Sequence, residues 1–238
     1  MQMKVVLFIL MLLGGYAISH AQLDAKDLLR GYIENMSKVS NPEDGKVYYI
    51  HMLVNNVYKQ ETHAIKKVEF KAYMTADQMV VNSNVMQAFG DTADVFTIIP
   101  ATRQIIQQNG IVIGGNALQR NRLLNMQQDL VENCQVVEQK MLPNEVVMLK
   151  LKPAESIAEN KKIESLVLYY CQNKAQITKV CIFYDKHSLV KAQEIDYKAL
   201  DFDASMVLDS TPMVQRILDI NGELKEPYRS YTLINQKQ

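Results

Sequence analysis

The chain has 238 residues, and its 26 basic and 26 acidic side chains give a formal net charge of +0. Nucleic-acid binding needs a basic surface to meet the phosphates, so this balance argues against a nucleic-acid partner and we expect none. The length suits one domain with a sizeable core or two small ones, and because no linker rich in Pro, Ser or Gly interrupts it, we expect one domain.

The N-terminus has the pattern of a secretory signal peptide. Lys4 precedes an apolar run over residues 5–13, and Ser19 and Ala21 place small residues where a signal peptidase cleaves. The run is shorter than the roughly 20 residues that span a bilayer. Gln22 follows, and it lacks the thiol that lipid attachment requires. We therefore predict a signal peptide at 1–21 and a soluble exported domain at 22–238 that does not span the membrane, with an uncleaved anchor as the alternative.

Two amphipathic helices are predicted, over residues 23–39 and 117–136. Asp24 and Asn116 are residue types typical of helix N-caps. Apolar residues recur at helical spacing in both segments: Leu28, Leu29, Tyr32, Ile33 and Met36 in the first, and Leu123, Leu124, Met126, Leu130, Val131 and Cys134 in the second. Each helix therefore has one apolar face that must cover another element.

Between the two helices, residues 46–110 show the period of two that is typical of β-strands. In 47–58 and 68–76 the even positions are apolar: Tyr48, Ile50, Met52, Val54, Tyr58, Val68, Phe70, Ala72 and Met74. Further alternating runs at 79–89 and 95–100 lead to the tight-turn signal Asn109-Gly110. One apolar and one wet face predict an antiparallel sheet packed on one side.

After the second helix, residues 146–203 predict an antiparallel meander of three or four strands. Runs rich in Val, Ile, Leu and Tyr alternate there with short polar turns. The C-terminus allows two interpretations: a hairpin around Asn221-Gly222, which we favour, or a short helix that starts at Thr211-Pro212.

No catalytic or metal-binding motif is recognisable, so we expect no enzyme, no cofactor and no metal. The four histidines fall at no metal-ligand spacing, and residues 201–205 imitate a calcium loop without its glycine and closing glutamate. Cys134, Cys171 and Cys181 are an odd number with apolar neighbours, so we expect buried free thiols, with a Cys171–Cys181 bridge as the alternative. The 13 methionines suit either an irregular core or a surface that adapts to apolar ligands.

Two stretches, together with the order of the elements, point to a known family. Residues 91–105, DTADVFTIIPATRQI, carry an aspartate, an aromatic residue, a proline and a basic residue before an apolar one. Residues 149–153, LKLKP, end a strand with lysine and proline before the meander closes. In these features the chain resembles the periplasmic lipoprotein-carrier superfamily, which has the LolA/LolB-like fold.

The resemblance implies an α+β fold: a curved antiparallel β-sheet, an unclosed half-barrel, covered by helices on its concave face. It also implies a periplasmic protein that carries or binds an acyl chain, a lipid or a lipid-modified protein in a hydrophobic cavity between sheet and helices. The residues expected to line this lipid-binding cavity come from the apolar faces described above: Ile50, Met52, Val54, Phe70, Ala72 and Met74 from the strands, Leu29, Ile33 and Met36 from the first helix, and Leu123, Met126 and Leu130 from the second.

A second hypothesis belongs to another class of protein. The same fold with a filled interior would serve as a non-enzymatic assembly or interaction module of the envelope with a protein partner. That hypothesis predicts an exposed apolar patch or an open sheet edge in place of a cavity.

Overall fold

The computed structural model describes residues 24–40, 42–60, 67–110 and 133–237. The predicted signal peptide and most of the second predicted helix, with Leu123, Met126 and Leu130, lie outside these ranges. Within the described residues, no helix is both long and apolar enough to cross a membrane.

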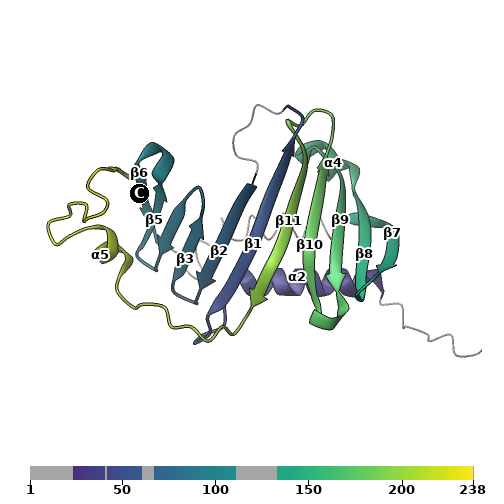
Figure 1. Cartoon of the computed structure of the whole chain (residues 1–238), viewed down its shortest axis with the longest axis horizontal. Coiled ribbons are helices and arrows are strands. Elements are labelled where there is room, and N and C mark those ends of the chain that lie inside the picture. Colours follow the sequence, from purple (N-terminus) through teal and green to yellow (C-terminus); the bar gives the residue numbers. More distant parts are fainter. Residues whose placement is uncertain (1–23, 41, 61–66, 111–132, 238) are drawn as a thin grey trace, which may run out of the picture.

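One large sheet dominates the described structure (Figure 1). Its strands are β1 Tyr48–Tyr58, β2 Lys67–Met74, β3 Met79–Ser83, β4 Gln87–Gly90, β5 Asp94–Ile99, β6 Gln104–Asn109, β7 Cys134–Leu142, β8 Val146–Pro153, β9 Ile163–Cys171, β10 Gln176–Tyr184, β11 Val190–Asp201 and β12 Thr232–Asn235. They form a 12-stranded sheet in the order β12-β6-β5-β4-β3-β2-β1-β11-β10-β9-β8-β7. Neighbouring strands are antiparallel, except that β12 runs parallel to β6.

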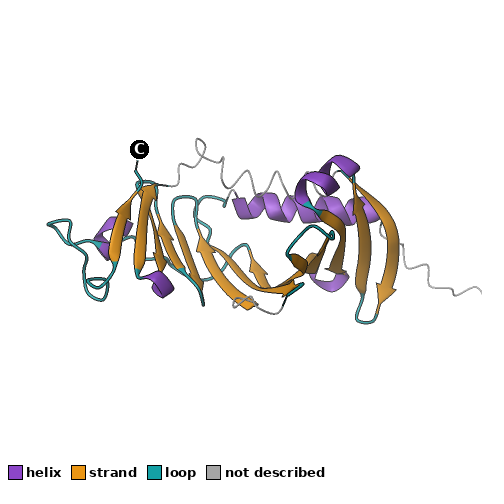
Figure 2. Cartoon of the chain, turned by 90° about the horizontal axis from the view of Figure 1, so that it is seen from above, coloured by secondary structure: helices purple, strands orange, loops and turns teal. Residues whose placement is uncertain are grey.

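The sheet is open and curved, so the predicted fold class is confirmed as a mostly antiparallel, unclosed sheet consistent with a half-barrel (Figure 2). Described helices are few: α2 Ala25–Ser40, α4 Glu155–Lys161 and α5 Met213–Ile217, with 3-10 turns at Pro100–Thr102 and Gln172–Lys174. The oxygen Oδ1 of Asp24 accepts a hydrogen bond from the Lys26 amide at the start of α2, as expected for a cap.

The two faces of the sheet can be followed from strand to strand, because residues paired across strands share a face. Face A carries Tyr48, Ile50, Met52 and Val54 of β1. It continues across the sheet through a row of cross-strand partners: Val54, Ile195, Val180, Leu168 and Leu149. Face B is the opposite side and carries Tyr49, His51 and Leu53 of β1.

Helix α2 packs on face A over β8, β9 and β10. Leu28, Leu29 and Tyr32 are buried there with a group of strand residues. That group is Val147, Leu149, Leu151, Ile163, Leu166, Leu168, Ile177 and Val180. We call this cluster the α2 core, and each fully buried side chain in it contributes about 1.5–3 kcal/mol relative to exposure.

Helix α5 packs at the other end of the sheet and on the other face. Met213 and Ile217, both 0% exposed, contact Phe96, Ile98 and Ile105. Phe96 pairs with Phe89, which pairs with Val80, and this row leads to Tyr73 and Tyr49 on face B. We call this cluster the α5 core.

Polar contacts at the turn before β5 hold the C-terminal segment on the α5 core. The Met213 amide donates to Asp91 Oδ2 at 2.7 Å. The buried Asp94 carboxylate accepts a hydrogen bond from Gln107 Nε2 at 2.6 Å and pairs with Lys237 Nζ at 2.5 Å. The chain end is therefore attached to the sheet by charge as well as by apolar packing.

Two predictions about secondary structure are wrong. The C-terminal end of the helix predicted at 117–136 is a strand, because Cys134 and Val136 pair with Pro153 and Leu151 in β7. A β-branched pair, Val136-Val137, suits a strand better than a helix end. The favoured C-terminal hairpin is also wrong, because its last strand, β12, pairs with β6.

The residues after Pro212 form the short helix that was the alternative interpretation. Pro212 fixes a helical start, and the four-residue spacing brings Met213 and Ile217 onto one helix face. The Asn221-Gly222 turn closes a single antiparallel bridge between Leu218 and Leu224. Strand β12 then runs parallel to β6 and does not pair with the segment before it.

Candidate functional site

The candidate site is an apolar strip on face A of the central strands. Ile50, Ala72 and Met74 are buried together, with Met79, Val81 and Leu200 packed half-buried against them. Met52, Val54 and Phe70 share this face and are also half-buried. We call these nine residues the central strip.

The six strand residues predicted to line a cavity all belong to this strip. Their pairs in the register, Ile50 with Ala72 and Met52 with Phe70, put them on one face, as the alternation in the sequence predicts. Val54 and Met74 continue the same face at its two ends. A continuous apolar surface thus runs along two neighbouring strands.

The predicted helix residues lie elsewhere or are not described. Leu29 is buried in the α2 core, and Ile33 packs half-buried against it, opposite β8–β10. Leu123, Met126 and Leu130 lie outside the described residues, and the Met36 side chain is not described. Among the described residues, the cluster around Ile50 contains no helix residue.

The central strip and the α2 core meet at β11. Ile195 and Tyr197 pair with Val54 and Met52 of the strip, and both also pack against the α2 core. A ligand on the strip would therefore reach the flank of α2 by crossing one strand. Sequence reasoning missed Ile195, Tyr197 and Leu200 as site residues, although the apolar run after residue 189 indicated a strand.

A pair of tyrosine hydroxyls lies at this border. The Tyr32 hydroxyl from α2 and the Tyr197 hydroxyl from β11 form a hydrogen bond. Burial raises the pKa of Tyr32 well above its ordinary value of 10.0, and the neighbouring Tyr197 adds to this shift. Burial also raises the pKa of Tyr197. Both hydroxyls therefore stay protonated at neutral pH, so the border offers a neutral polar group beside an apolar surface.

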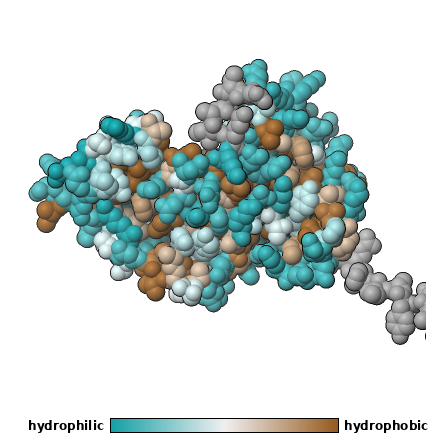
Figure 3. All heavy atoms as spheres, in the orientation of Figure 1, coloured by the Kyte–Doolittle hydropathy of each residue, from teal (hydrophilic) through white to brown (hydrophobic). Residues whose placement is uncertain are grey.

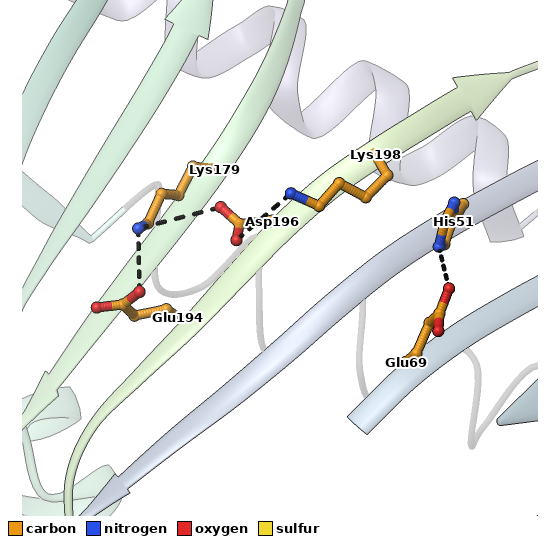
Figure 4. A network of polar contacts seen from close by, with 6 residues as sticks. All are labelled: His51, Glu69, Lys179, Glu194, Asp196 and Lys198. Atoms are coloured by element: carbon orange, nitrogen blue, oxygen red, sulfur yellow. Dashed lines mark hydrogen bonds and ion pairs between the residues drawn. The ribbon is translucent and has the colours of Figure 1, made fainter. Parts of the chain in front are cut away.

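Face B of the same strands is charged. His51 Nε2 lies 2.7 Å from Glu69 Oε1, and Lys179 Nζ lies 3.0 Å from Glu194 and 4.0 Å from Asp196 (Figure 4). The hydrogen bond that Lys179 donates to Glu194 raises the pKa of Lys179, and the negative charge of Glu194 adds to this shift. In Figure 4 these side chains lie on the side of the strands away from α2. The space-filling view of this side is mostly hydrophilic, with scattered hydrophobic residues (Figure 3).

The chemistry of reactive groups is limited in the described residues. No group of three or more His, Cys, Asp or Glu side chains in them could hold a metal ion. Cys134, Cys171 and Cys181 form no disulfide with one another, so the alternative Cys171–Cys181 bridge is absent, and only Cys181 is buried, while Cys134 and Cys171 are half-buried. Burial raises the pKa of Cys134 to about 11, so its thiol is protonated and a poor nucleophile at neutral pH.

Surface depressions occur away from the strip. One of about 470 Å³ lies between β7 and α4 and is lined by Gln135, Lys152 and Glu155 among others. Another of about 390 Å³ lies beside α5 and Ile220. Their linings mix charged and apolar groups, in contrast to the apolar central strip.

Comparisons with known proteins give structural relatives only. No protein-family model and no curated protein matches the sequence. An uncharacterized conserved protein from Thermus thermophilus aligns with a TM-score of 0.45 and 8% identity, over 89% of this chain and 99% of that one. LprF from Mycobacterium bovis aligns with a TM-score of 0.40 and 11% identity, over 74% and 93%.

A third solved structure is described as an outer membrane lipoprotein-sorting protein domain, from Vibrio parahaemolyticus. It aligns with a TM-score of 0.32 and 11% identity, over 75% of this chain and 95% of that one. The predicted resemblance thus has a counterpart among the structural neighbours.

Proposed function

We propose that this chain is a non-enzymatic, exported binding protein that holds an acyl chain, free or attached to a lipid or protein, on the central strip. The observation that supports the proposal most is the half-buried apolar row of Met52, Val54 and Phe70. The same face of the sheet is covered by α2 over β8–β10, whereas these three side chains stay half exposed. Burying apolar side chains is favourable, so a half-exposed row of them is unusual. A lipophilic ligand would provide that cover.

The energetics need no catalytic group. Each methylene that leaves water contributes about 0.8 kcal/mol, so a long alkyl chain could be held by apolar contact alone. Met52, Met74 and Met79 give the strip unbranched, adaptable side chains that suit chains of different shape. In this proposal face A is the concave face of the half-barrel. The ligand lies on that face, on the side of the sheet against which α2 packs.

The tyrosine pair gives the ligand a polar end. An ester carbonyl or a carboxyl oxygen could accept a hydrogen bond from the Tyr32–Tyr197 pair, whose hydroxyls stay protonated. Export by the segment at 1–21 would place such a protein in the periplasm, where acyl chains need an apolar carrier to cross water. This location is part of the proposal.

The test is direct detection of the ligand. The protein is purified under native conditions, extracted with organic solvent, and the extract is analysed by mass spectrometry. We expect acyl-containing species at a defined stoichiometry and their displacement by a fluorescent fatty acid. An extract without lipid, together with no saturable binding of the fatty acid by the extracted and refolded protein, would contradict the proposal.

A further inference from the structure

Strand β7 is an open edge of the sheet. It lies last in the strand order and pairs only with β8 among the described strands (Figure 1). It spans nine residues, and none of its side chains is fully buried. The opposite edge, β12, spans only four residues. An edge of this length presents a row of backbone N–H and C=O groups that can pair with another strand.

The side chains of this edge show an ordered pattern around Gln139. Val137 and Met141 lie two residues on either side of it, and their exposed fractions are 49% and 52%. Glu138 and Lys140 flank it directly, carry opposite charges and form an ion pair with each other on face B. Residues at equal distances from Gln139 are thus alike in kind: both are apolar at a distance of two residues, and both are charged at a distance of one. The two charges are opposite in sign.

We propose that β7 pairs with β7 of a second copy of this chain, antiparallel and across a two-fold axis at Gln139. In this register Glu138 of one copy lies opposite Lys140 of the other, and the reverse pair forms at the same time. Val137 of each copy lies opposite Met141 of the other, because residues at equal distance from the axis meet. The two exposed apolar residues therefore cover each other.

Charge complementarity favours this register and a second copy as the occupant. Centring the pairing one residue earlier would put Glu138 opposite itself, and one residue later would put Lys140 opposite itself. Like charges directly opposite each other are destabilising, and opposite charges are favourable. In the proposed register the four side chains form a ring of alternating charge, an extension of the ion pair already present within each chain.

The bulge in β7 agrees with this arrangement. The register with β8 shifts between Val136 and Glu138, with Val137 as the extra residue, so the regular part of the strand runs from Glu138 to Leu142. The axis at Gln139 keeps most of the pairing within this regular part. The two-fold pairing uses the β7 edge of both copies, so neither copy has a second β7 edge to offer to a third chain.

Charge reversal tests the register as well as the association. The mass of the purified protein in solution is measured by light scattering and by sedimentation over a wide concentration range. We expect a concentration-dependent dimer for the native chain. Glu138→Lys and Lys140→Glu should each shift the protein to monomer, since each puts like charges opposite one another.

Two further samples separate the proposed pairing from a general loss of stability. An equimolar mixture of the two single variants should form a heterodimer, because one edge then carries two lysines and the other two glutamates. The double variant, with both substitutions in one chain, should dimerise as the native chain does. A native chain that stays monomeric at every concentration, or a dimer that none of the reversals affects, would overturn the proposal.

Discussion

The two ends of this sheet are covered on opposite faces. At the β8–β10 end the 16-residue helix α2 covers face A, and at the β5–β6 end the five-residue helix α5 covers face B. The central strands lie between these two ends. There, face A is apolar with no described helix residue in its cluster, and face B carries ion pairs. The face that is covered by a helix thus changes from face A to face B along the sheet. The middle strands, which lie between the two covered ends, keep an apolar surface on face A.

The change of face follows from the residues of each strand. In β9, Leu166, Val167 and Leu168 are all buried, so the pattern is continuous. In β5, Phe96 and Ile98 alternate with half-buried Val95 and Thr97, so only one face is packed. Only one face of β5 therefore has to be covered by other residues, and the C-terminal segment covers that face, which is face B.

The largest effect is expected in the α2 core. Leu149 is 1% exposed, and Leu149→Ala should reduce the free energy of unfolding by about 3–5 kcal/mol because it leaves a cavity in packed surroundings. Chemical denaturation followed by circular dichroism measures this loss. A loss below about 1 kcal/mol would mean that this end is loosely packed and that the two ends are alike.

The α5 core should respond more locally. Ile217 is 0% exposed and Ile220 is 101% exposed, so the two isoleucines form a matched pair three residues apart. Ile217→Ala should cost about 2–4 kcal/mol and speed hydrogen exchange in β5 and β6. Ile220→Ala should stay within about 0.5 kcal/mol of the native chain. Equal effects of the two changes would contradict the packing of α5.

A smaller and pH-dependent effect is expected at Asp91. Burial alone would raise the pKa of this carboxyl, but hydrogen bonds from the amides of Met213, Asp94 and Ala93 outweigh it and lower the pKa below its ordinary value of 3.8. The stabilisation is therefore complete above the unfolded value and is lost as the pH falls through the folded one. Asp91→Asn should cost about 1–2 kcal/mol at neutral pH, because an amide accepts these hydrogen bonds less strongly than a carboxylate.

The same variant should also lose less stability than the native chain between about pH 5 and pH 2, since one titrating group is gone. Urea denaturation at a series of pH values measures both quantities. If acidification weakened the two proteins equally, the carboxylate would not hold the C-terminal segment.

The sequence predicted the strands whose pattern is local and clear. Period two located β1 and β2, and the apolar runs located β8 to β11. The run at 79–89 was seen, but not its division into β3 and β4, because the turn at Asn84 lies within continuous alternation. Strand β7 was missed because Cys134 continued a helical spacing, and the local signal for a strand, the pair Val136-Val137, is short, so the pairing with β8 decides the structure.

The candidate site was predictable in part for the same reason. Alternation was enough to put Ile50, Met52 and Phe70 on one face. Alternation could not show which helix lies over which strands, because that depends on the pairing of β1 with β11. In that pairing Tyr49 lies opposite Asp201 and Val57 lies opposite Ala192. Pairings so distant in sequence leave no periodic signal, and the position of Leu29 over β8–β10 follows from them.

If face A of the middle strands binds the ligand and face B does not, two neighbouring residues on β3 should respond differently to the same substitution. Val81 lies on face A in the strip, and Asn82 lies on face B opposite Lys71. Fluorescent fatty-acid binding is measured for Val81→Asp and Asn82→Asp, after circular dichroism has confirmed that both variants are folded. Val81→Asp should weaken binding by roughly two orders of magnitude, because it places a carboxylate against an alkyl chain, whereas Asn82→Asp should leave affinity nearly unchanged. Equal responses of the two folded variants would contradict the assignment of ligand binding to face A.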